Sequence, residues 1–270
     1  ESDRNDSRFV RAPERGGLGL DAHWNDDFHH ALHTLLTGER GGYYLDFGRM
    51  EDLKGAWAEG FVYSGRYSSY RRRHHGSFSG DLPASRFVVF SQNHDQVGNR
   101  MMGDRLGKLV PQEGLKLAAA AVLLSPFIPL LFMGEEYGET APFLYFISHS
   151  DPELIAAVRR GRQEEFASFA WKGDLSDPQE EATFLQAKLN WNLRQAKPHR
   201  TILEFYRELI RLRRALPPLA NLNKEEMAVL HWEKSRVLFV RRWRGEEEVF
   251  LAFNFGDSSV SLSLPVRPGR

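Results

Sequence analysis

The residues best suited to chemistry lie in the run FSQNHDQVGNR, Phe90 to Arg100. The run begins at the last residue of Phe87 to Phe90, an apolar segment that predicts a parallel strand covered on both faces. Polar residues at the carboxyl end of such a strand are where α/β barrels and open sheets place their active sites. His94 and Asp95 are therefore candidates for acid/base or charge-stabilising roles. A capped turn in which Asp95 binds local backbone N–H groups explains the same pattern about equally well.

Carboxylates also follow a second apolar segment, in the run MGEEYGE from Met133 to Glu139. Glu135 and Glu136 have the chemistry to bind polyol hydroxyls or to exchange protons with a substrate. Solvated carboxylates at a strand end are a slightly better explanation of this run. Glu1 is a lone carboxylate, and by itself it has no claim to function unless a strand precedes it.

The run DAHWNDDFHH, Asp21 to His30, combines histidines with acids and so raises the question of a metal site. His29 and His30 are adjacent on the expected helix, so they cannot easily share one ion, and the chain has no H-E-x-x-H spacing. We therefore expect no metal and no other cofactor. A strand end at which Trp24 stacks on a sugar ring explains the run better.

A basic run with aromatic residues spans Tyr67 to His75. Such a run can bind nucleic acid. Here 36 Lys and Arg balance 36 Asp and Glu, so no net charge attracts nucleic acid or an anionic membrane. We expect a loop in which Tyr70 and Arg71 line a cleft, one by stacking and the other by hydrogen bonding.

The composition is that of a folded globular chain. Its 270 residues are 41% hydrophobic and 27% charged, and their number is about that of one complete (β/α)8 barrel. The lack of cysteine excludes disulfides, thiolate metal sites and cysteine nucleophiles. The longest apolar stretch, Leu115 to Met133, contains a lysine and two prolines, so we expect no membrane span. The sequence has no Gly-rich phosphate loop and no G-x-S-x-G motif. No signal peptide is visible, and we expect a cytoplasmic protein.

Strands and helices alternate through the first part of the chain, which indicates an α/β fold with parallel strands. Asn25 is expected to cap a helix that Gly38 ends. The other expected elements are strands at 18–24, 87–90 and 128–133, helices at 50–57 and 115–124, a loop at 63–80, and an elaborated loop with short helices at 143–190.

The last part of the chain has a different pattern. Thr201 to Glu204 is a capping-box sequence that predicts the start of an amphipathic helix. Pro217 and Pro218 are expected to end this helix and to mark a domain boundary. Beyond them, alternating apolar and polar residues predict a small antiparallel β module. Its four strands are expected at 228–232, 237–243, 249–255 and 260–264.

The run FSQNHDQVGNR resembles the strand-7 motif of the α-amylase family, glycoside hydrolase family 13. Further runs resemble one subfamily, the maltooligosyltrehalose trehalohydrolases. These enzymes cut the α-1,4 bond next to a terminal trehalose unit and so release trehalose. The runs that carry this resemblance are ESDRND, DAHWNDDFHHALH, TGERGGYYLDFG, FMGEEYGE and GRQEEF. The similarity spans about Glu1 to Trp191 and continues more weakly beyond. It implies the carboxyl-terminal half of a TIM (β/α)8 barrel at 1–217, from the end of strand 5 to helix 8, and a carboxyl-terminal β-sandwich domain at 218–270.

The resemblance also implies roles for individual residues. Glu1, in its E-S-D context, matches the general acid/base of the family. Asp95 matches the transition-state stabiliser, and His94 matches a contact to the reacting sugar. The other residues expected to bind substrate are Asn93, Asp21, Trp24, Asp26, His29, Tyr43, Tyr70, Arg71, Gln96 and Glu135.

The implied reaction is retaining hydrolysis, in which a nucleophile lies about 5–5.5 Å from the acid. In the family this nucleophile is an Asp after barrel strand 4, so we expect it upstream of Glu1 and expect these 270 residues alone to be inactive. The implied partner is maltooligosyltrehalose or a related α-glucan, without nucleic acid or membrane. Two alternatives stay open: another family member such as a branching enzyme, and a non-catalytic carbohydrate-binding protein. The oligomeric state also stays open.

Overall fold

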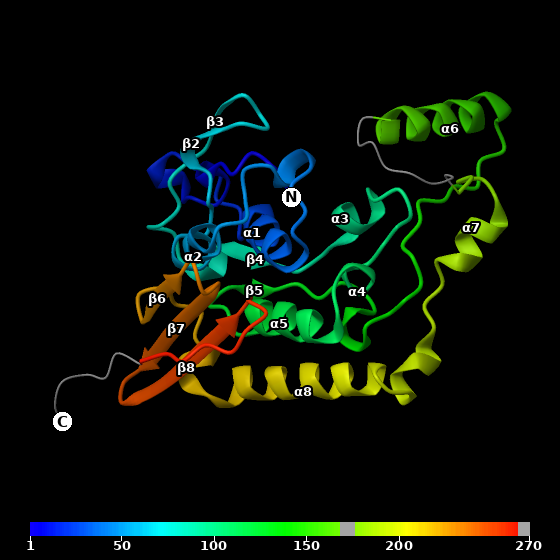
Figure 1. The fold of residues 1–270 in the computed structure, drawn as a ribbon. Coiled ribbons are helices and arrows are strands. Elements are labelled where there is room, and N and C mark those ends of the chain that lie inside the picture. The colour runs from blue at the N-terminus through cyan, green and yellow to red at the C-terminus, as the bar shows by residue number, and fades with distance from the viewer. Residues whose placement is uncertain (168–175, 264–270) are drawn as a thin grey trace.

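Three short parallel strands lie at the centre of the fold in the computed structural model, which describes residues 1–167 and 176–263 (Figure 1). They are β1 (His23–Trp24), β4 (Phe87–Val89) and β5 (Ile128–Pro129), in the order β1-β4-β5. His23 pairs with Phe87, and Val88 pairs with Ile128. Among the described residues, β1 and β5 each pair with one strand, so both edges of this sheet are open.

The strand predicted at 18–24 is shorter in the structure because its first residues bond elsewhere. The N–H groups of Leu18 and Leu20 donate to the carbonyls of Arg8 and Phe9, at 2.7 and 2.9 Å. The strand predicted at 128–133 is also shorter. The Leu130 N–H still donates to Val89, and the chain then turns away from the sheet.

Helices connect the parallel strands, as an α/β fold requires. Between β1 and β4 lie α1 (Asp26–Thr37) and α2 (Met50–Ala58). Between β4 and β5 lie α3 (His94–Gly98), α4 (Leu106–Leu109) and α5 (Gln112–Leu123). After β5 come α6 (Pro152–Ala167), α7 (Glu181–Gln186), α8 (His199–Ala215) and α9 (Pro217–Ala220). Short 3-10 turns occupy Ser7–Phe9, Pro13–Arg15, Gly42–Tyr44, Ala84–Arg86, Glu135–Tyr137 and Trp191–Gln195.

The predicted ends of α1 are confirmed. The Asn25 side chain accepts a hydrogen bond from the Phe28 N–H at 3.2 Å. Gly38 ends the helix with a φ of 77°, a left-handed conformation that residues with a Cβ adopt only at a cost. Local sequence therefore determines where this helix begins and ends.

The loop predicted at 63–80 contains a β-hairpin, so that prediction is wrong at its centre. β2 (Ser64–Ser68) and β3 (Arg73–Gly76) pair antiparallel, with an irregular register between Ser64 and Tyr67. The hairpin is built largely from polar residues, and it lacks the apolar alternation that predicts a strand. Its pairing depends instead on contacts with residues outside the hairpin.

Two predictions for the region before the prolines are also wrong. The expected short helices at 143–190 include α6, which has 16 residues and lies away from the sheet (Figure 1). The capping box at Thr201 to Glu204 does not form, because α8 begins at His199. The Glu204 carboxylate bonds with Arg200 at 2.8 Å, and His199 Nδ1 bonds with the carbonyl of Tyr137 at 2.9 Å.

The last strands form a three-stranded antiparallel sheet: β6 (Met227–Trp232), β7 (Val237–Arg244) and β8 (Glu247–Asn254). Three of the four predicted strands are therefore confirmed. The fourth is not formed at 260–263, and Leu264 lies outside the described residues. After β8 the chain turns back, since the Phe255 N–H donates to the Arg236 carbonyl at 2.8 Å.

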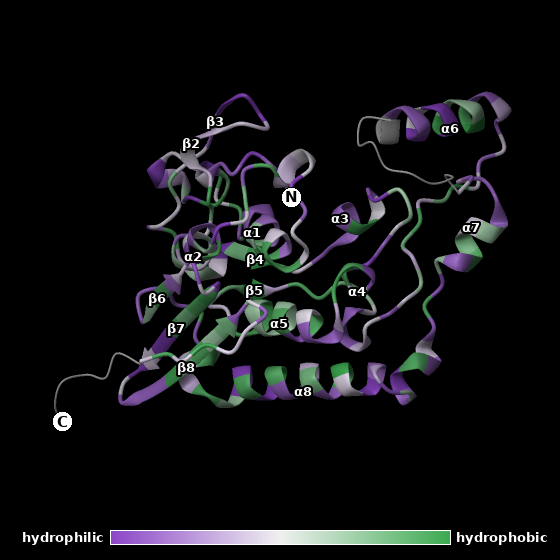
Figure 2. Ribbon diagram, viewed as in Figure 1, coloured by the Kyte–Doolittle hydropathy of each residue, from purple (hydrophilic) through white to green (hydrophobic). Residues whose placement is uncertain are grey.

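The larger apolar core joins the parallel sheet, helices α1, α2 and α5, and the antiparallel sheet, and a second cluster packs α8 and α9 against α5. In Figure 2, β4 is mostly hydrophobic, whereas α8 alternates between hydrophobic and hydrophilic residues along its length. Fully or nearly fully buried members of the core include Phe28, Trp57, Phe87, Phe127, Leu238 and Phe253. The core thus crosses the expected domain boundary at 217/218, which stays a prediction. No helix of the described residues is long and apolar enough to cross a membrane.

Candidate active site

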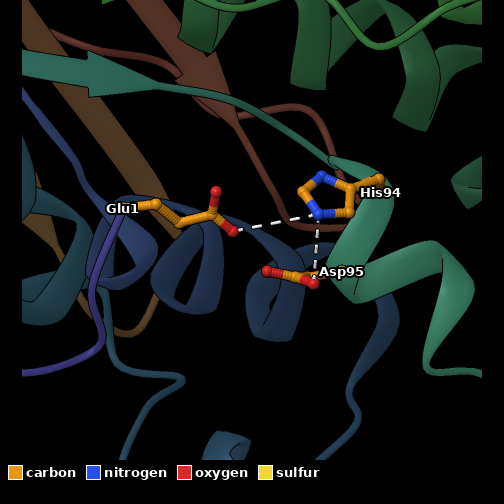
Figure 3. A group of neighbouring side chains, drawn as sticks. All are labelled: Glu1, His94 and Asp95. Carbon is orange, nitrogen blue, oxygen red and sulfur yellow. Dashed lines mark ion pairs between the residues drawn. The ribbon is translucent and has the colours of Figure 1, made fainter.

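Glu1, His94 and Asp95 lie together at the carboxyl end of the parallel sheet (Figure 3). His94 Nε2 is 3.8 Å from a carboxylate oxygen of Glu1 and 3.3 Å from one of Asp95. The three side chains are each about half exposed, with 49–50% of their surface accessible. They are therefore within reach of a ligand.

The sequence around Asp95 explains how it is held there. Asn93 caps the short helix α3, and its side-chain oxygen accepts the N–H of Asp95 at 2.9 Å and of Gln96 at 3.2 Å. This cap follows β4 after only a few residues, so the sheet fixes where α3 begins. Asp95 thus projects from a turn whose backbone bonds are satisfied.

The environment of Glu1 favours its protonated form. A hydrogen bond with Asp95 raises the pKa of Glu1, and partial burial and the negative charge of Asp95 act in the same direction. His94 opposes this shift. A carboxyl group with a raised pKa next to a second carboxylate has the properties of a general acid.

Among the described residues, Glu1, His94 and Asp95 are also close enough together to bind one metal ion. Each offers one ligand atom, and these atoms lie within 4.8 Å of one another. The hydrogen bond with Asp95 raises the pKa of Glu1, which favours the protonated form of Glu1 beside the second carboxyl group.

Asp95 also lines a cleft of about 270 Å³. The cleft is formed by the first residues of the chain, α1, the 3-10 turn at Gly42–Tyr44, the β2–β3 hairpin and α3 with the residue that follows it. The lining residues are Asp3, Asp26, His30, Tyr43, Tyr70, Arg71, Asp95, Gln96 and Asn99. It thus brings together six of the residues expected from the sequence: Asp26, Tyr43, Tyr70, Arg71, Asp95 and Gln96.

The charged groups of the cleft are held in place by specific contacts. Arg71 donates to the Asp3 carboxylate at 2.9 Å. Partial burial alone would raise the pKa of Asp3, but the Arg71 guanidinium lowers it below its usual range. Burial raises the pKa of Asp26 to about 7, assisted by the charge of Asp27, although a hydrogen bond from Gln96 at 3.1 Å opposes the shift. The cleft thus contains an ionised acid, a cation and a carboxyl that is partly protonated near neutral pH.

Two of the expected substrate-binding residues are buried behind the cleft. His29 is 1% exposed, and its ring nitrogens bond with the Ser91 carbonyl at 2.7 Å and the Tyr44 hydroxyl at 2.8 Å. Glu135 is 6% exposed and accepts the Tyr206 hydroxyl at 3.2 Å. Neither side chain faces the cleft.

The remaining expected residues occupy three other positions. Asn93 is buried as the cap of α3. Trp24 packs edge-on against His94, with ring centres 5.8 Å apart, and so lies beside the candidate acid. The Asp21 side chain is fully exposed, and its nearest cation is Arg86 at 3.9 Å.

Three cleft residues were missed from the sequence: Asp3, His30 and Asn99. Each lies inside a run that was singled out, so the run itself was the available signal. His30 stacks on Tyr43, with ring centres 4.9 Å apart. Burial lowers the pKa of His30 to about 3, so its ring is neutral. Which member of each run lines the cleft depends on loop geometry that the sequence pattern does not contain.

Comparison with known proteins reveals clear relatives. The chain is 45% identical to malto-oligosyltrehalose trehalohydrolase of Rhizobium sp. (strain M-11), over 98% of this chain and 44% of that protein. It is 51% identical to the protein of the same name from Saccharolobus solfataricus, over 79% of this chain and 36% of that protein. The chain therefore spans less than half the length of these curated relatives.

Solved structures agree with this relationship. A Salmonella typhimurium protein assigned as an α-amylase matches with a TM-score of 0.83 and 40% identity, over 99% of this chain and 46% of that chain. Pullulanase type I from Bacillus subtilis str. 168 matches with a TM-score of 0.54 and 15% identity, over 91% and 30%, which indicates a shared fold alone. No protein-family model matches the chain.

The parallel strands, the carboxylates at their ends and these relatives define the class. The chain belongs to the α-amylase family of glycoside hydrolases. Within that family it is related to the malto-oligosyltrehalose trehalohydrolases, several of which are 41–51% identical to it.

Proposed function

We propose that this chain supplies the general acid/base and the transition-state stabiliser of a retaining glycoside hydrolase that releases trehalose from malto-oligosyltrehalose. The observation that carries the proposal is the group formed by Glu1, His94 and Asp95 beside the cleft. The substrate is inferred from the printed names of the relatives.

The chemistry assigns a task to each member of the group. Glu1, with its raised pKa, donates a proton to the oxygen of the leaving sugar and later removes a proton from the attacking water. Asp95 stabilises the positive charge that develops on the ring. His94 is positioned by its contacts with both carboxylates to donate a hydrogen bond to a sugar hydroxyl.

Retaining hydrolysis also needs a nucleophile. We propose that it comes from the part of the relatives that this chain does not cover. Two features support this: the chain spans 36–46% of the relatives, and both edges of the described β1-β4-β5 sheet are open. An open edge leaves backbone groups unpaired, whereas a closed barrel pairs every strand on both sides.

The finer assignments of the fold are part of the same proposal. We assign β1, β4 and β5 to barrel strands 6, 7 and 8, with Glu1 at the end of strand 5. The β6–β8 sheet is assigned to a carboxyl-terminal β-sandwich domain that begins at 218. The cytoplasmic location stays a prediction.

The test uses the extended polypeptide, meaning these 270 residues together with their native upstream part. We expect it to release trehalose from malto-oligosyltrehalose. Glu1→Gln and Asp95→Asn should each lower kcat by at least about 100-fold. Glu113→Gln, which removes an exposed carboxylate on α5, is the matched control and should leave kcat unchanged.

Other outcomes would separate the competing functions. New α-1,6 branches without trehalose would identify a branching enzyme. Binding of malto-oligosaccharide without turnover would identify a carbohydrate-binding protein. Trehalose release by the 270 residues alone would contradict an upstream nucleophile.

A further inference from the structure

Tyr70 and Arg71 enter the cleft from the turn between β2 and β3. This turn is at the surface, and Tyr70 is 43% exposed. The Arg71 guanidinium lies 5.9 Å from the centre of the Tyr70 ring and bonds with Asp3. An exposed polar hairpin is marginally stable by itself, so another part of the molecule has to hold this turn in position.

Asp46 makes the contacts that hold the turn. It follows the 3-10 turn at Gly42–Tyr44, and its carboxylate accepts four hydrogen bonds. The donors are the hydroxyls of Tyr63 and Ser68, both at 2.6 Å, and the N–H groups of Ser69 at 2.9 Å and Tyr70 at 3.2 Å. Two consecutive backbone N–H groups of the turn are thus fixed by one side chain.

The contact extends to Arg71 through Ser68. The Ser68 hydroxyl donates to Asp46 and accepts the Arg71 N–H at 3.0 Å. The backbones of both cleft residues are therefore tied, directly or through one hydroxyl, to the Asp46 carboxylate. Asp46 itself does not line the cleft.

We propose that Asp46 is a positioning residue that sets Tyr70 and Arg71 for binding the sugar in this cleft. The inference rests on the proposed function, since it requires that the cleft binds sugar. It explains why a carboxylate with four donors lies under the turn rather than in the cleft. Partial burial would raise the pKa of Asp46, but its donors, Ser68 and Tyr63 first, lower it to about 2. Asp46 is therefore an anion near neutral pH.

The test is a double-mutant cycle in the extended polypeptide. Asp46→Asn should raise KM at least about fivefold, because it loses charge-assisted hydrogen bonds to the turn, while kcat changes less. Arg71→Ala should raise KM as well. In the double variant the two effects should not add, because Asp46 acts through the turn that carries Arg71. Additive effects, or an unchanged KM in Asp46→Asn, would overturn the proposal.

Two further variants keep the test decisive. Asp81→Asn removes an exposed carboxylate that pairs with Arg11 outside the cleft, and it should leave KM unchanged. Ser68→Ala removes the hydroxyl that links Asp46 to the Arg71 N–H, and it replaces Asp46→Asn if that variant does not fold. An unchanged KM in Ser68→Ala would then refute the proposal.

Direct binding separates this inference from the proposed function. The Kd of malto-oligosyltrehalose is measured by calorimetry in the Glu1→Gln background, where turnover is suppressed. We expect Asp46→Asn to weaken binding at least about fivefold there. Absence of both binding and trehalose release in the parent would refute the proposed function. Normal binding and release in the parent, with equal Kd in Asp46→Asn, would refute the positioning role alone.

Discussion

Carboxyl groups in this chain have different properties because their surroundings differ. Glu1 is half exposed and has a pKa raised by its hydrogen bond with Asp95, whereas Glu135 is buried among hydroxyl and amide donors. Burial raises the pKa of Glu135 to about 8. Glu1 is therefore suited to exchange protons with a ligand. Glu135 instead links the end of β4 to α8 through hydrogen bonds with Ser91 and Tyr206.

Glu135→Gln should change how stability depends on pH. The pKa of Glu135 in the folded protein, about 8, lies above its ordinary value of 4.5. The neutral carboxyl therefore stabilises the fold below about pH 4.5, and this contribution is lost as the pH rises toward 8. We expect the Tm of Glu135→Gln relative to the parent to rise between pH 5 and 8. A constant Tm difference across this range would contradict the raised pKa.

Asp95→Asn should lower the pKa of Glu1. The parent Asp95 raises that pKa by a hydrogen bond and by its charge, and the amide removes the charge. Carbon-13 NMR of the Glu1 carboxyl in the extended polypeptide measures the effect. Glu113→Gln is the control and should leave the Glu1 titration unchanged; the same midpoint in Asp95→Asn and the parent would disprove the coupling.

His94 and Asp95 could be found from local sequence, because polar residues after a buried strand are a general sign of a site. Glu1 could not, since a single acid has no pattern, and only the resemblance pointed to it. The sequence also placed Glu135 in the substrate site. It is instead buried, because the turn after β5 directs it toward Tyr206.

Among the elements, local signals predicted the ends of α1 but not the β2–β3 hairpin. Asn25 and Gly38 delimit α1 by their own chemistry. The β2–β3 hairpin has no such signal, because Asp46 holds its turn from a distant part of the chain. The capping box at Thr201 to Glu204 does not form because α8 begins earlier, at His199, so Thr201 lies inside the helix. Elements defined by distant contacts are the ones that the sequence pattern misses.

Asn25→Ala should destabilise the molecule by about 2 kcal/mol, because it removes the cap of α1 and a buried hydrogen bond. Asn25 is fully buried, accepts from Phe28 and donates to the Gly60 carbonyl at 2.8 Å. Urea denaturation of the extended polypeptide measures the loss. Asn192→Ala, at an exposed 3-10 turn, should cost less than about 0.5 kcal/mol. Equal losses of unfolding free energy in Asn25→Ala and Asn192→Ala would show that the Asn25 cap does not stabilise the molecule.

Two arginines from later parts of the chain bind the carboxyl end of α5, and one of them, Arg242, comes from the antiparallel sheet. Arg213 of α8 donates to the carbonyls of Leu123, Ser125 and Phe127, which follow or end α5. Arg242 of β7 is 1% exposed and donates to the Leu124 carbonyl at 2.9 Å. Both cations bind where the dipole of α5 is negative.

Arg242→Met should therefore destabilise the molecule by about 2 kcal/mol or more, because the carbonyl groups that accept hydrogen bonds from Arg242 lose their donor in a buried site. Arg244→Met, at the exposed end of the same strand, is the control and should have little effect. Thermal unfolding of the extended polypeptide measures both. Equal Tm values for the two variants would show that Arg242 does not help to join β7 to the end of α5.

Glu1 as the general acid is the central assignment, and the dependence of the rate on the leaving group tests it directly. Glu1→Gln should lose at least about 100-fold in kcat/KM on malto-oligosyltrehalose, whose leaving sugar needs a proton. It should lose far less on a maltosyl fluoride, since fluoride leaves without protonation. Equal losses on the two substrates would contradict the assignment of Glu1 as the acid.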